Sequence, residues 1–444
     1  MERITASREW VPAESVRFYE GQAAKYRTLP ASDFAGEVAR TLAAHERYTD
    51  LDCINLYAGT NFMNPRAARF QASSIGSRPS LGYPGDKYET GLGYAEQIEI
   101  MAVELIKRIF KCEYVEFRVG SGSLANLYAY MACTKPGDKI MALPASAAGH
   151  VTHHAEGAAG LYGLEIHHIP FDGDRMEVDL VTLRELARQL RPKLIILGAS
   201  LALQPYPVRE VRQLADEIGA YLMFDAAHLS GIIAGGEFQQ PLAEGAHLMT
   251  CSTYKSFGGP AGGLVLTNDG QVAEKLDRIA YPGLTANFDL ARTAALVVAA
   301  SDILEFGPAY ARACIANARA LAAALTGQGL PVHGPAHKGY TLSHHVAVQA
   351  AGFGGGTTAS RRLEPANILT SGIGLPLPVL ENDYNGLRIG TQEITRWGMQ
   401  PGDMPGIAEF IARILVKGED PVAVQPEVIG LRHHFKSLQF VFPE

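Results

Sequence analysis

One lysine stands in a setting that suits covalent chemistry. Lys255 lies in the segment TCSTYKSFGGPAGG, residues 250–263, among small and hydroxylated residues that let its amine reach into a cavity. A lysine amine can attack an aldehyde and form a Schiff base. Apolar residues flank the segment, which predicts a tight turn between two strands. A lone lysine on a turn is more often only solvated, so the interpretation depends on what else the chain supplies.

Two other charged residues have chemistry that such a site needs. Asp225 follows the apolar run YLMF, and a carboxylate at the carboxyl end of a parallel strand faces the functional crevice. There it could keep a ring nitrogen protonated, or it could simply cap the next helix. Arg388, in NGLRIGTQ, carries a planar fork that suits a substrate carboxylate, although a surface ion pair is the ordinary alternative.

A small-residue turn supplies a candidate anion site. Ser121, Gly122 and Ser123 stand between a predicted strand and a predicted helix. Backbone N–H groups at a helix N-terminus, together with two hydroxyls, can hold a phosphate. The same residue types also serve as ordinary helix caps, and both alternatives stay open.

Histidines add a third kind of group. His150 and His153 lie in GHVTHH, where an imidazole could stack on a flat cofactor ring. The spacing H-x-x-H also occurs in metal sites, but no cysteine or carboxylate ligand set stands nearby. His228, three residues after Asp225, could orient a cofactor, and as a single histidine it could equally be structural.

The elements that must position these residues follow a clear order. From residue 114 to residue 267 apolar strands alternate with amphipathic helices, which predicts an α/β fold with a mostly parallel sheet covered on both faces. We expect an N-terminal helical arm over residues 1–54 and a large domain over 55–298. A smaller α+β domain should occupy 299–444, with a long Ala-rich helix over 291–328 bridging the two domains.

Composition and net charge limit the kinds of partner and the cellular location that we expect. The chain has 444 residues and a net charge of −7, which argues against nucleic acid or an anionic membrane as a partner. Five scattered cysteines without C-x-x-C spacing favour a reducing, cytoplasmic location over a disulfide framework. No secretory signal is recognisable at the start, and no apolar run reads as a membrane span.

These parts occur in an order that resembles a known family. The chain is similar to the fold-type-I pyridoxal phosphate enzymes and, among them, to the serine hydroxymethyltransferase group, from about residue 55 to residue 415. Seven motifs carry the resemblance: GYPGDKY (82–88), GSGSLAN (120–126), GHVTH (149–153), GAS (198–200), FDAAHLSG (224–231), STYKSFGGPAGG (252–263) and LRIGTQEITRWG (387–398).

The resemblance implies a cofactor and the residues that bind it. Lys255 would form the Schiff base with pyridoxal 5'-phosphate, and Asp225 would pair with the pyridine nitrogen. His150 would stack on the ring. The remaining cofactor contacts would come from Ser121, Gly122 and Ser123 at the phosphate and from Ser200 and His228 near the phenolic oxygen.

The resemblance also implies a substrate side. Arg388 would bind the α-carboxylate of a small amino acid, and Thr253 would lie beside the Schiff base. Because members of the family are dimers with shared active sites, Tyr83 and Tyr88 would serve the site of the partner subunit. We therefore expect a homodimer, or a tetramer built from such dimers.

The sequence departs from the family where folate acts. Folate-using members carry a Tyr-x-Glu before the GYPG loop, and the matching positions here are Pro79 and Leu81. Where the family has the second of two tyrosines after that loop, this chain has Glu89. Where the family has a histidine directly before the lysine, this chain has Tyr254. A leucine cannot transfer a proton, so another group must act as the base, with Glu89 or His153 as candidates.

We therefore expect an enzyme that breaks or forms the Cα–Cβ bond of a β-hydroxy-α-amino acid. Serine, α-methylserine and threonine-like compounds are the candidate substrates, and an aldehyde is the product or co-substrate. The expected chemistry is that of a folate-independent aldolase or transaldolase. A tetrahydrofolate-dependent hydroxymethyltransferase is the alternative, followed by an aminotransferase and then by a binding protein without catalysis.

Overall fold

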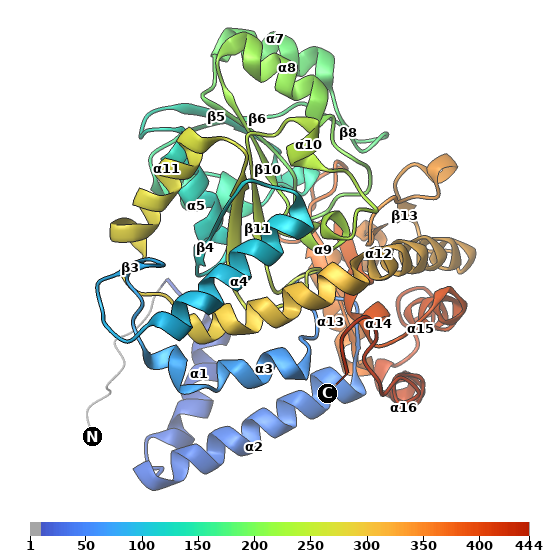
Figure 1. Cartoon of the computed structure of the whole chain (residues 1–444). Coiled ribbons are helices and arrows are strands. Elements are labelled where there is room, and N and C mark those ends of the chain that lie inside the picture. Colours follow the sequence, from blue (N-terminus) through green and yellow to red (C-terminus); the bar gives the residue numbers. More distant parts are fainter. Residues whose placement is uncertain (1–9, 444) are drawn as a thin grey trace. The chain divides into compact units, whose positions relative to one another are not determined.

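The computed structural model of the chain describes residues 10–443 (Figure 1). Contacts divide the chain into two compact units, Met1–Asp52 and Cys53–Glu444, and each is described by itself.

The first unit is helical in its described part, residues 10–52. Helix α1 (Ala13–Tyr26) begins after a proline, and helix α2 (Phe34–Glu46) runs into a π-helical turn, Arg47–Asp52. Lys25 near the end of α1 pairs with Glu37 in the first turn of α2. Residues 10–52 are mainly helical, as expected, while the arm boundary at residue 54 stays a prediction and residues 1–9 lie outside the described part.

The second unit is organised around a seven-stranded sheet. The strand order is β4-β12-β11-β10-β9-β5-β6; β12 runs antiparallel to both of its neighbours, and the other pairs are parallel. The predicted mostly parallel sheet is therefore confirmed. The strands are β4 (Tyr114–Val119), β5 (Lys139–Ala142), β6 (Glu165–His168), β9 (Leu194–Leu197), β10 (Tyr221–Asp225), β11 (Leu248–Ser252) and β12 (Gly263–Thr267).

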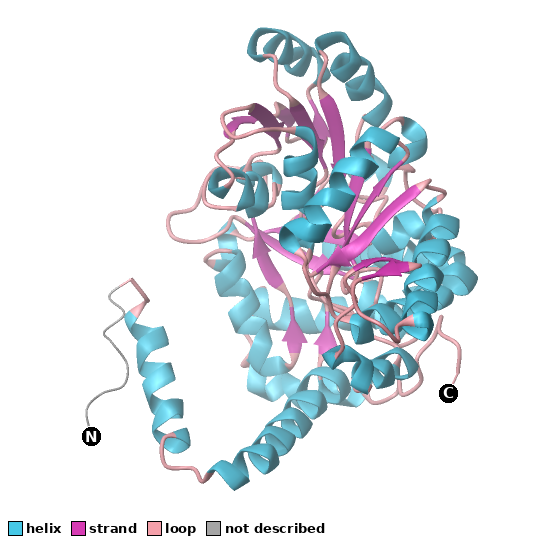
Figure 2. Cartoon of the chain, turned by 60° about the vertical axis from the view of Figure 1, so that its left-hand side comes forward, coloured by secondary structure: helices cyan, strands magenta, loops and turns pink. Residues whose placement is uncertain are grey.

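Helices cover both faces of this sheet (Figure 2). Because strand side chains alternate, Ile195 and Leu197 pack into one apolar cluster while Leu194 and Ile196 pack into the other. The first cluster also takes residues from α4, α7, α8 and α12, and the second takes residues from α5 and α11. These helices are α4 (Gly93–Phe110), α5 (Gly122–Cys133), α7 (Leu180–Leu190), α8 (Val208–Ile218), α11 (Gly270–Arg278) and α12 (Leu290–Gly327).

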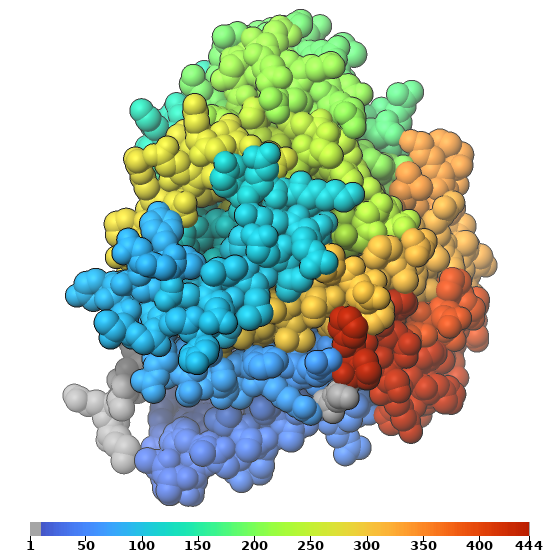
Figure 3. Space-filling model, in the orientation of Figure 1, coloured from blue at the N-terminus to red at the C-terminus, as the bar shows by residue number. Residues whose placement is uncertain are grey.

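Helix α12 links the apolar cores. Its first half packs beside α4, as Figure 3 shows on one face, and contributes Leu296 and Tyr310 to the core of the large sheet. Its second half contributes Leu321 and Leu325 to the C-terminal core. By length and composition α12 could span a membrane, a property that the sequence reading missed, but 56% of its apolar window is buried within the protein. That burial is typical of a core helix.

The C-terminal part contains an antiparallel sheet of order β13-β14-β17-β16. Strand β1 (Ile54–Asn55) pairs with β15 (Ile368–Leu369), so the start of this unit belongs to the C-terminal core. The predicted boundary at 298/299 falls inside α12, and the division into a large and a small domain stays a prediction. The sheet and its helices are β13 (Val332–His333), β14 (His345–Gln349), β16 (Ser371–Ile373), β17 (Gly386–Gly390), α13 (Gly356–Leu363), α14 (Gln392–Arg396), α15 (Met404–Leu415) and α16 (Pro421–Arg432).

Shorter elements complete the unit. The hairpin β2–β3 belongs to the GYPG loop, and α9 follows the Asp225 strand. These elements are α3 (Pro65–Gln71), α6 (Ala158–Leu161), α9 (Ser230–Ala234), α10 (Pro241–Glu244), β2 (Gly82–Tyr83), β3 (Asp86–Lys87), β7 (Phe171–Asp172) and β8 (Glu177–Val178).

Candidate active site

Lys255 lies in the turn between the antiparallel strands β11 and β12, as predicted. Its side chain is buried, and its Nζ lies 3.1 Å from Nε2 of His228. Burial lowers the pKa of Lys255 from 10.5 to about 8, an effect that Asp225 opposes and Arg388 reinforces. The amine is therefore neutral far more often than a surface lysine would be, which is what a nucleophilic amine needs.

Hydrogen bonds fix the turn around the lysine. The Thr253 hydroxyl donates to the Pro260 carbonyl at 2.5 Å, so its own proton is used within the turn. The Ser256 hydroxyl donates to the His228 carbonyl at 2.5 Å. Gly258 has a φ of +72°, and a Cβ there would meet the Arg396 guanidinium at 2.7 Å, so only glycine fits. The turn thus holds the lysine in one place.

Asp225 ends strand β10 and is fully enclosed. Its carboxylate accepts hydrogen bonds from His153 Nε2, from Asn126 Nδ2 and from the Ala227 amide, each at 2.9 Å. Burial alone would raise the pKa of Asp225, but the hydrogen bond and the electrostatic attraction of His153 bring it below its usual range. Asp225 therefore stays ionised and suits a protonated ring nitrogen.

Sequence reasoning missed the partners of Asp225. Asn126 closes the GSGSLAN motif one turn into α5, and its amide reaches both Asp225 and the Thr152 hydroxyl. His153 uses both ring nitrogens, one on Asp225 and the other on the Tyr130 hydroxyl at 2.6 Å. With both nitrogens engaged and the ring buried, His153 has no free position from which to take a proton from a substrate.

His150 faces the same crevice as a neutral ring. Its Nδ1 lies 2.8 Å from the Thr152 hydroxyl, and burial lowers the pKa of His150 to about 4. A neutral, flat imidazole fits the predicted stacking on a cofactor ring. In residues 10–443 no group of three histidine, cysteine or acidic side chains is placed to hold a metal ion.

The Ser121–Ser123 turn opens helix α5. The Ser121 hydroxyl caps the helix by accepting from the Leu124 amide at 3.1 Å. A Cβ on Gly122 would lie 2.2 Å from the Ser252 hydroxyl, so the absence of a side chain lets that hydroxyl approach the helix N-terminus. Within the described residues the buried Ser252 hydroxyl has no hydrogen-bond partner. Unpaired helix amides and this orphaned hydroxyl fit an anionic group such as a phosphate.

Arg388 stands on strand β17 opposite Ser371 of β16. Its Nη1 donates to the Ser200 carbonyl at 2.8 Å, and its Nε donates to the Ser371 hydroxyl at 3.2 Å. Burial lowers the pKa of Arg388, yet a guanidinium remains charged at any ordinary pH. The Ser200 carbonyl thus orients Arg388, while the predicted contact of Ser200 with the cofactor stays a prediction.

A histidine pair lies behind the lysine. His228 Nδ1 contacts the Ala58 carbonyl at 3.2 Å, which leaves Nε2 as the acceptor for Lys255. Burial holds the pKa of His228 well below its usual range. The ring of His345 lies 5.7 Å from that of His228, and its Nδ1 accepts from the Ala202 amide. No local pattern in the sequence marks His345 as a neighbour of the lysine, because the contact is made only in the folded chain.

The GYPG loop stands apart from these contacts. Tyr83 and Tyr88 are exposed, at 45% and 82%. Glu89 accepts a hydrogen bond from the Leu81 amide at 3.0 Å, and Lys87 anchors the loop by an ion pair with buried Glu99. The described contacts do not bring Tyr83, Tyr88 or Glu89 to Lys255, so their roles at a shared site stay predictions.

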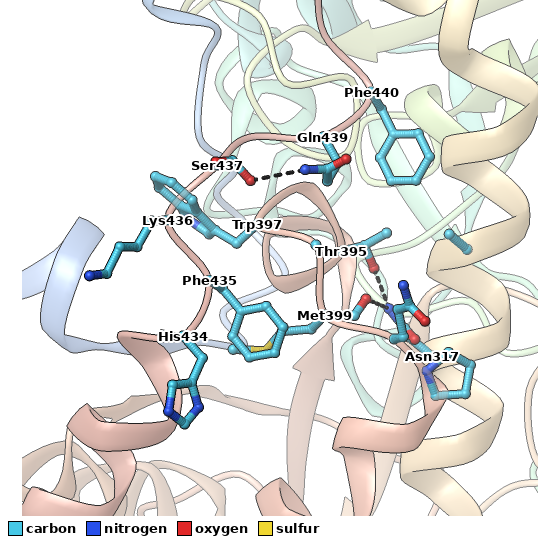
Figure 4. Close-up of a pocket in the computed structure, with 14 residues that line it drawn as sticks. Asn317, Thr395, Trp397, Met399, His434, Phe435, Lys436, Ser437, Gln439 and Phe440 are labelled. Atoms are coloured by element: carbon cyan, nitrogen blue, oxygen red, sulfur yellow. Dashed lines mark hydrogen bonds between the residues drawn. The ribbon is translucent and has the colours of Figure 1, made fainter.

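A cavity of about 630 Å³ lies between α12 and the segments around residues 395–401 and 434–440 (Figure 4). In it Asn317 donates to the Thr395 hydroxyl and to the Met399 carbonyl. It contains none of the predicted site residues and is separate from the site. It is lined by Ala313, Asn317, Thr395, Trp397, Gly398, Met399, Gln400, Pro401, His434, Phe435, Lys436, Ser437, Gln439 and Phe440.

The residues of the site fit pyridoxal 5'-phosphate. The near-neutral amine of Lys255 suits its aldehyde, and the ionised Asp225 suits its ring nitrogen. The open helix terminus beside Ser252 suits its phosphate. The sheet order and this set of groups define a fold-type-I pyridoxal phosphate enzyme.

Comparison with known proteins gives the family. The model of the serine hydroxymethyltransferase family matches residues 32–411. The chain therefore belongs to this family, whose members depend on pyridoxal phosphate.

The similarity to individual relatives covers nearly the whole chain. An α-methylserine aldolase from Ralstonia sp. is 49% identical over 98% of this chain and 99% of the relative, and one from Variovorax paradoxus is 50% identical over 98% of each. The serine hydroxymethyltransferase of Pyrococcus horikoshii is 39% identical over 92% of this chain and 97% of its own. The crystal structure of L-threonine transaldolase from Pseudomonas fluorescens superposes with a TM-score of 0.85 at 25% identity, covering 95% and 96% of the two chains.

Proposed function

We propose that this protein is a pyridoxal phosphate-dependent aldolase that cleaves or forms the Cα–Cβ bond of a β-hydroxy-α-amino acid without folate. α-Methylserine is the first candidate substrate. The observation that carries the proposal is a complete set of groups for binding the cofactor and a carboxylate, combined with an apolar Leu81 where folate-using members carry glutamate. The aldolases from Ralstonia and Variovorax, at 49% and 50% identity, support the same substrate.

The proposed reaction balances with two products. The β-hydroxyl of α-methylserine loses its proton, and the Cα–Cβ bond breaks, so that Cβ leaves as formaldehyde. The electron pair of that bond stays on Cα, which then takes a proton to give alanine. When bound, pyridoxal phosphate supplies the electron sink for this pair. No oxidant or further co-substrate is needed.

The residues of the chain have distinct tasks in this reaction. Arg388 holds the α-carboxylate and thereby aligns the bond that breaks. The Lys255 amine, with a pKa of about 8, can carry a proton at Nζ and return it to Cα, and His228 Nε2 holds that amine in place. Asp225 remains ionised and would pair with the ring nitrogen of the cofactor, and the neutral imidazole of His150 would stack on the ring.

The base for the β-hydroxyl is proposed on the substrate side. Glu89 remains the candidate from the sequence, and its carboxylate is anchored by the Leu81 amide in the exposed GYPG loop. We propose that two chains form a homodimer in which this loop, with Tyr83 and Tyr88, completes the site of the partner. The exposure of both tyrosines in the single chain supports this arrangement. Light scattering of the purified holoenzyme tests it, and a monomer that is fully active would contradict it.

A substrate panel tests the reaction class. The holoenzyme is incubated with α-methylserine, serine and threonine in turn, and the aldehyde and amino-acid products are quantified. We expect formaldehyde and alanine in equal amounts from α-methylserine. Conversion of the cofactor to its amine form by amino acid alone would instead indicate an aminotransferase. A protein that binds no pyridoxal phosphate would overturn the enzymatic proposal altogether.

A tetrahydrofolate-dependent hydroxymethyltransferase is the second candidate. It is supported by the family match and by the 39% identity to the Pyrococcus horikoshii enzyme. It predicts that tetrahydrofolate is consumed as the one-carbon acceptor in proportion to the amino acid cleaved. The absence of a carboxylate at position 81 argues against this candidate.

A further inference from the structure

A tyrosine outside the family motifs lies beside the carboxylate-binding arginine. Tyr57 follows strand β1, and the centroid of its ring lies 5.8 Å from the guanidinium carbon of Arg388. The Tyr57 side chain is 36% exposed, so one side of it faces open space. Tyr57 is therefore partly open to solvent while its ring lies beside Arg388.

The neighbouring glycine shows that the ring position is built into the fold. A Cβ on Gly59 would lie 2.7 Å from Cζ of Tyr57 and 2.8 Å from its hydroxyl oxygen. The phenol thus fills the space that a side chain at position 59 would take. The turn itself is fixed, because the Gln392 side chain donates to the carbonyls of Tyr57 and Thr60 at 2.9 and 2.7 Å. The backbone that carries the phenol is therefore fixed beside Gly59.

Hydrogen-bond chemistry gives the phenol a free donor. A guanidinium can only donate, and Arg388 already donates to the Ser200 carbonyl and the Ser371 hydroxyl. The Tyr57 ring lies against this guanidinium, and because a guanidinium has no acceptor, the Tyr57 hydroxyl cannot donate its proton to Arg388. Its O–H proton then remains available for a second acceptor next to the guanidinium. A carboxylate bound by Arg388 is an acceptor in that position.

We propose that Tyr57 is a second carboxylate-binding residue, which donates its hydroxyl proton to the substrate α-carboxylate held by Arg388. The pair then fixes the carboxylate from two directions, and Gly59 makes room for the phenol that does so. The inference rests on the proposed function only in that the substrate is an α-amino acid. It adds a contact that the motif comparison with the family does not supply.

Replacing the hydroxyl tests the contact directly. In Tyr57→Phe holoenzyme the dissociation constants of α-methylserine and glycine are measured from the change in cofactor absorbance. Loss of one charge-assisted hydrogen bond should weaken binding about tenfold, with the loss falling on KM more than on kcat. Tyr114→Phe, at an exposed tyrosine of β4, is the matched control and should bind like the parent protein.

A second variant keeps the Tyr57 hydroxyl but displaces it by a change at the neighbouring glycine. Gly59→Ala pushes the phenol away because the added Cβ and the ring cannot share the space, and it should weaken binding as Tyr57→Phe does. Gly402→Ala is its control, because a Cβ there meets no atom within 4 Å. Thermal unfolding checks that each variant folds.

Unchanged dissociation constants in both folded variants would overturn the role of Tyr57. A parent enzyme that binds amino acids but releases no aldehyde would overturn only the proposed function, because the binding readout is independent of cleavage. Weaker binding in Tyr57→Phe would support the contact even then.

Discussion

The cofactor side and the substrate side of the site are held in different ways. On the cofactor side Asp225 is buried and takes three hydrogen bonds, and its partner His153 has both ring nitrogens engaged. On the substrate side Arg388 is buried but lies against Tyr57, which is partly exposed. Around Asp225 the cofactor side is closed by mutual contacts, whereas the substrate side is partly open to solvent at Tyr57.

This difference separates two kinds of consequence. Removing one member of a closed, buried network leaves the others unpaired, which is costly and is felt by the whole site. Changing a partly exposed side chain with spare donors alters one contact with the ligand. We therefore expect substitutions on the cofactor side to affect the reaction itself and substitutions on the substrate side to affect binding and selectivity.

The largest effect should follow loss of the lysine. Lys255→Ala removes the amine that bonds the cofactor aldehyde, and activity should fall by at least about a thousandfold. The visible absorbance band of the lysine-bound cofactor should vanish, which a spectrum of the purified protein records. Lys107→Ala on the surface of α4 is the control. A persistent, unchanged band in Lys255→Ala would show that another residue holds the cofactor.

Arg388→Ala should weaken the binding of the amino acid but not the binding of the cofactor. The variant loses a buried, charge-assisted contact with the carboxylate, so the dissociation constant for the amino acid should rise about a hundredfold. The absorbance of the bound cofactor should stay as in the parent protein, because Arg388 is on the substrate side. Arg413→Ala, which loses only ion pairs with Glu419 and Glu427, is the control. If Arg388→Ala weakened the binding of pyridoxal phosphate as much as that of the amino acid, the two sides would not be separable, and this would contradict the account.

His153→Phe should weaken the binding of pyridoxal phosphate indirectly, through Asp225. Asp225 loses one of its three donors, so its pKa should rise and its hold on a protonated ring nitrogen should weaken. We expect the dissociation constant of pyridoxal phosphate for the apoprotein to rise about tenfold, measured by fluorescence titration. His167→Gln, at a partly exposed histidine bonded to Glu165, is the control. Unaltered cofactor affinity would show that Asp225 does not depend on His153.

The smallest effect concerns pH. Only the neutral amine of Lys255 attacks the aldehyde, and burial lowers its pKa to about 8. The neutral fraction, and with it the rate at which the apoprotein takes up pyridoxal phosphate, should rise about fivefold from pH 7 to pH 8 and level off above pH 9. Stopped-flow absorbance measures this rate. A rate that keeps rising tenfold per unit up to pH 10 would indicate a lysine with an ordinary pKa.

The sequence predicted the backbone positions of the site better than its contacts. Lys255 was expected on a turn between strands and Asp225 at a strand end, and both are there, because strand periodicity and turn residues are local signals. Asn126 was missed as a partner of Asp225, and Tyr57 as a neighbour of Arg388. Both contacts join residues far apart in the chain, so only the folded packing brings them together.

The substrate side was the least predictable from the sequence for a physical reason. Tyr83, Tyr88 and Glu89 lie in a loop whose contacts within one chain do not reach the lysine. Their predicted roles depend on a second copy of the chain, whose position local patterns do not encode. The division expected at residue 298 stays a prediction, and it falls within α12, which contributes to both cores as one continuous helix.

The most direct test of the central claim is formaldehyde release from α-methylserine by the holoenzyme, measured with and without tetrahydrofolate. Because Leu81 cannot transfer a proton as the glutamate of folate-using members would, we predict release at the same rate in both conditions, with one alanine formed per formaldehyde. Release that occurs only when tetrahydrofolate is present would contradict the account and assign the protein to the folate-dependent members of its family.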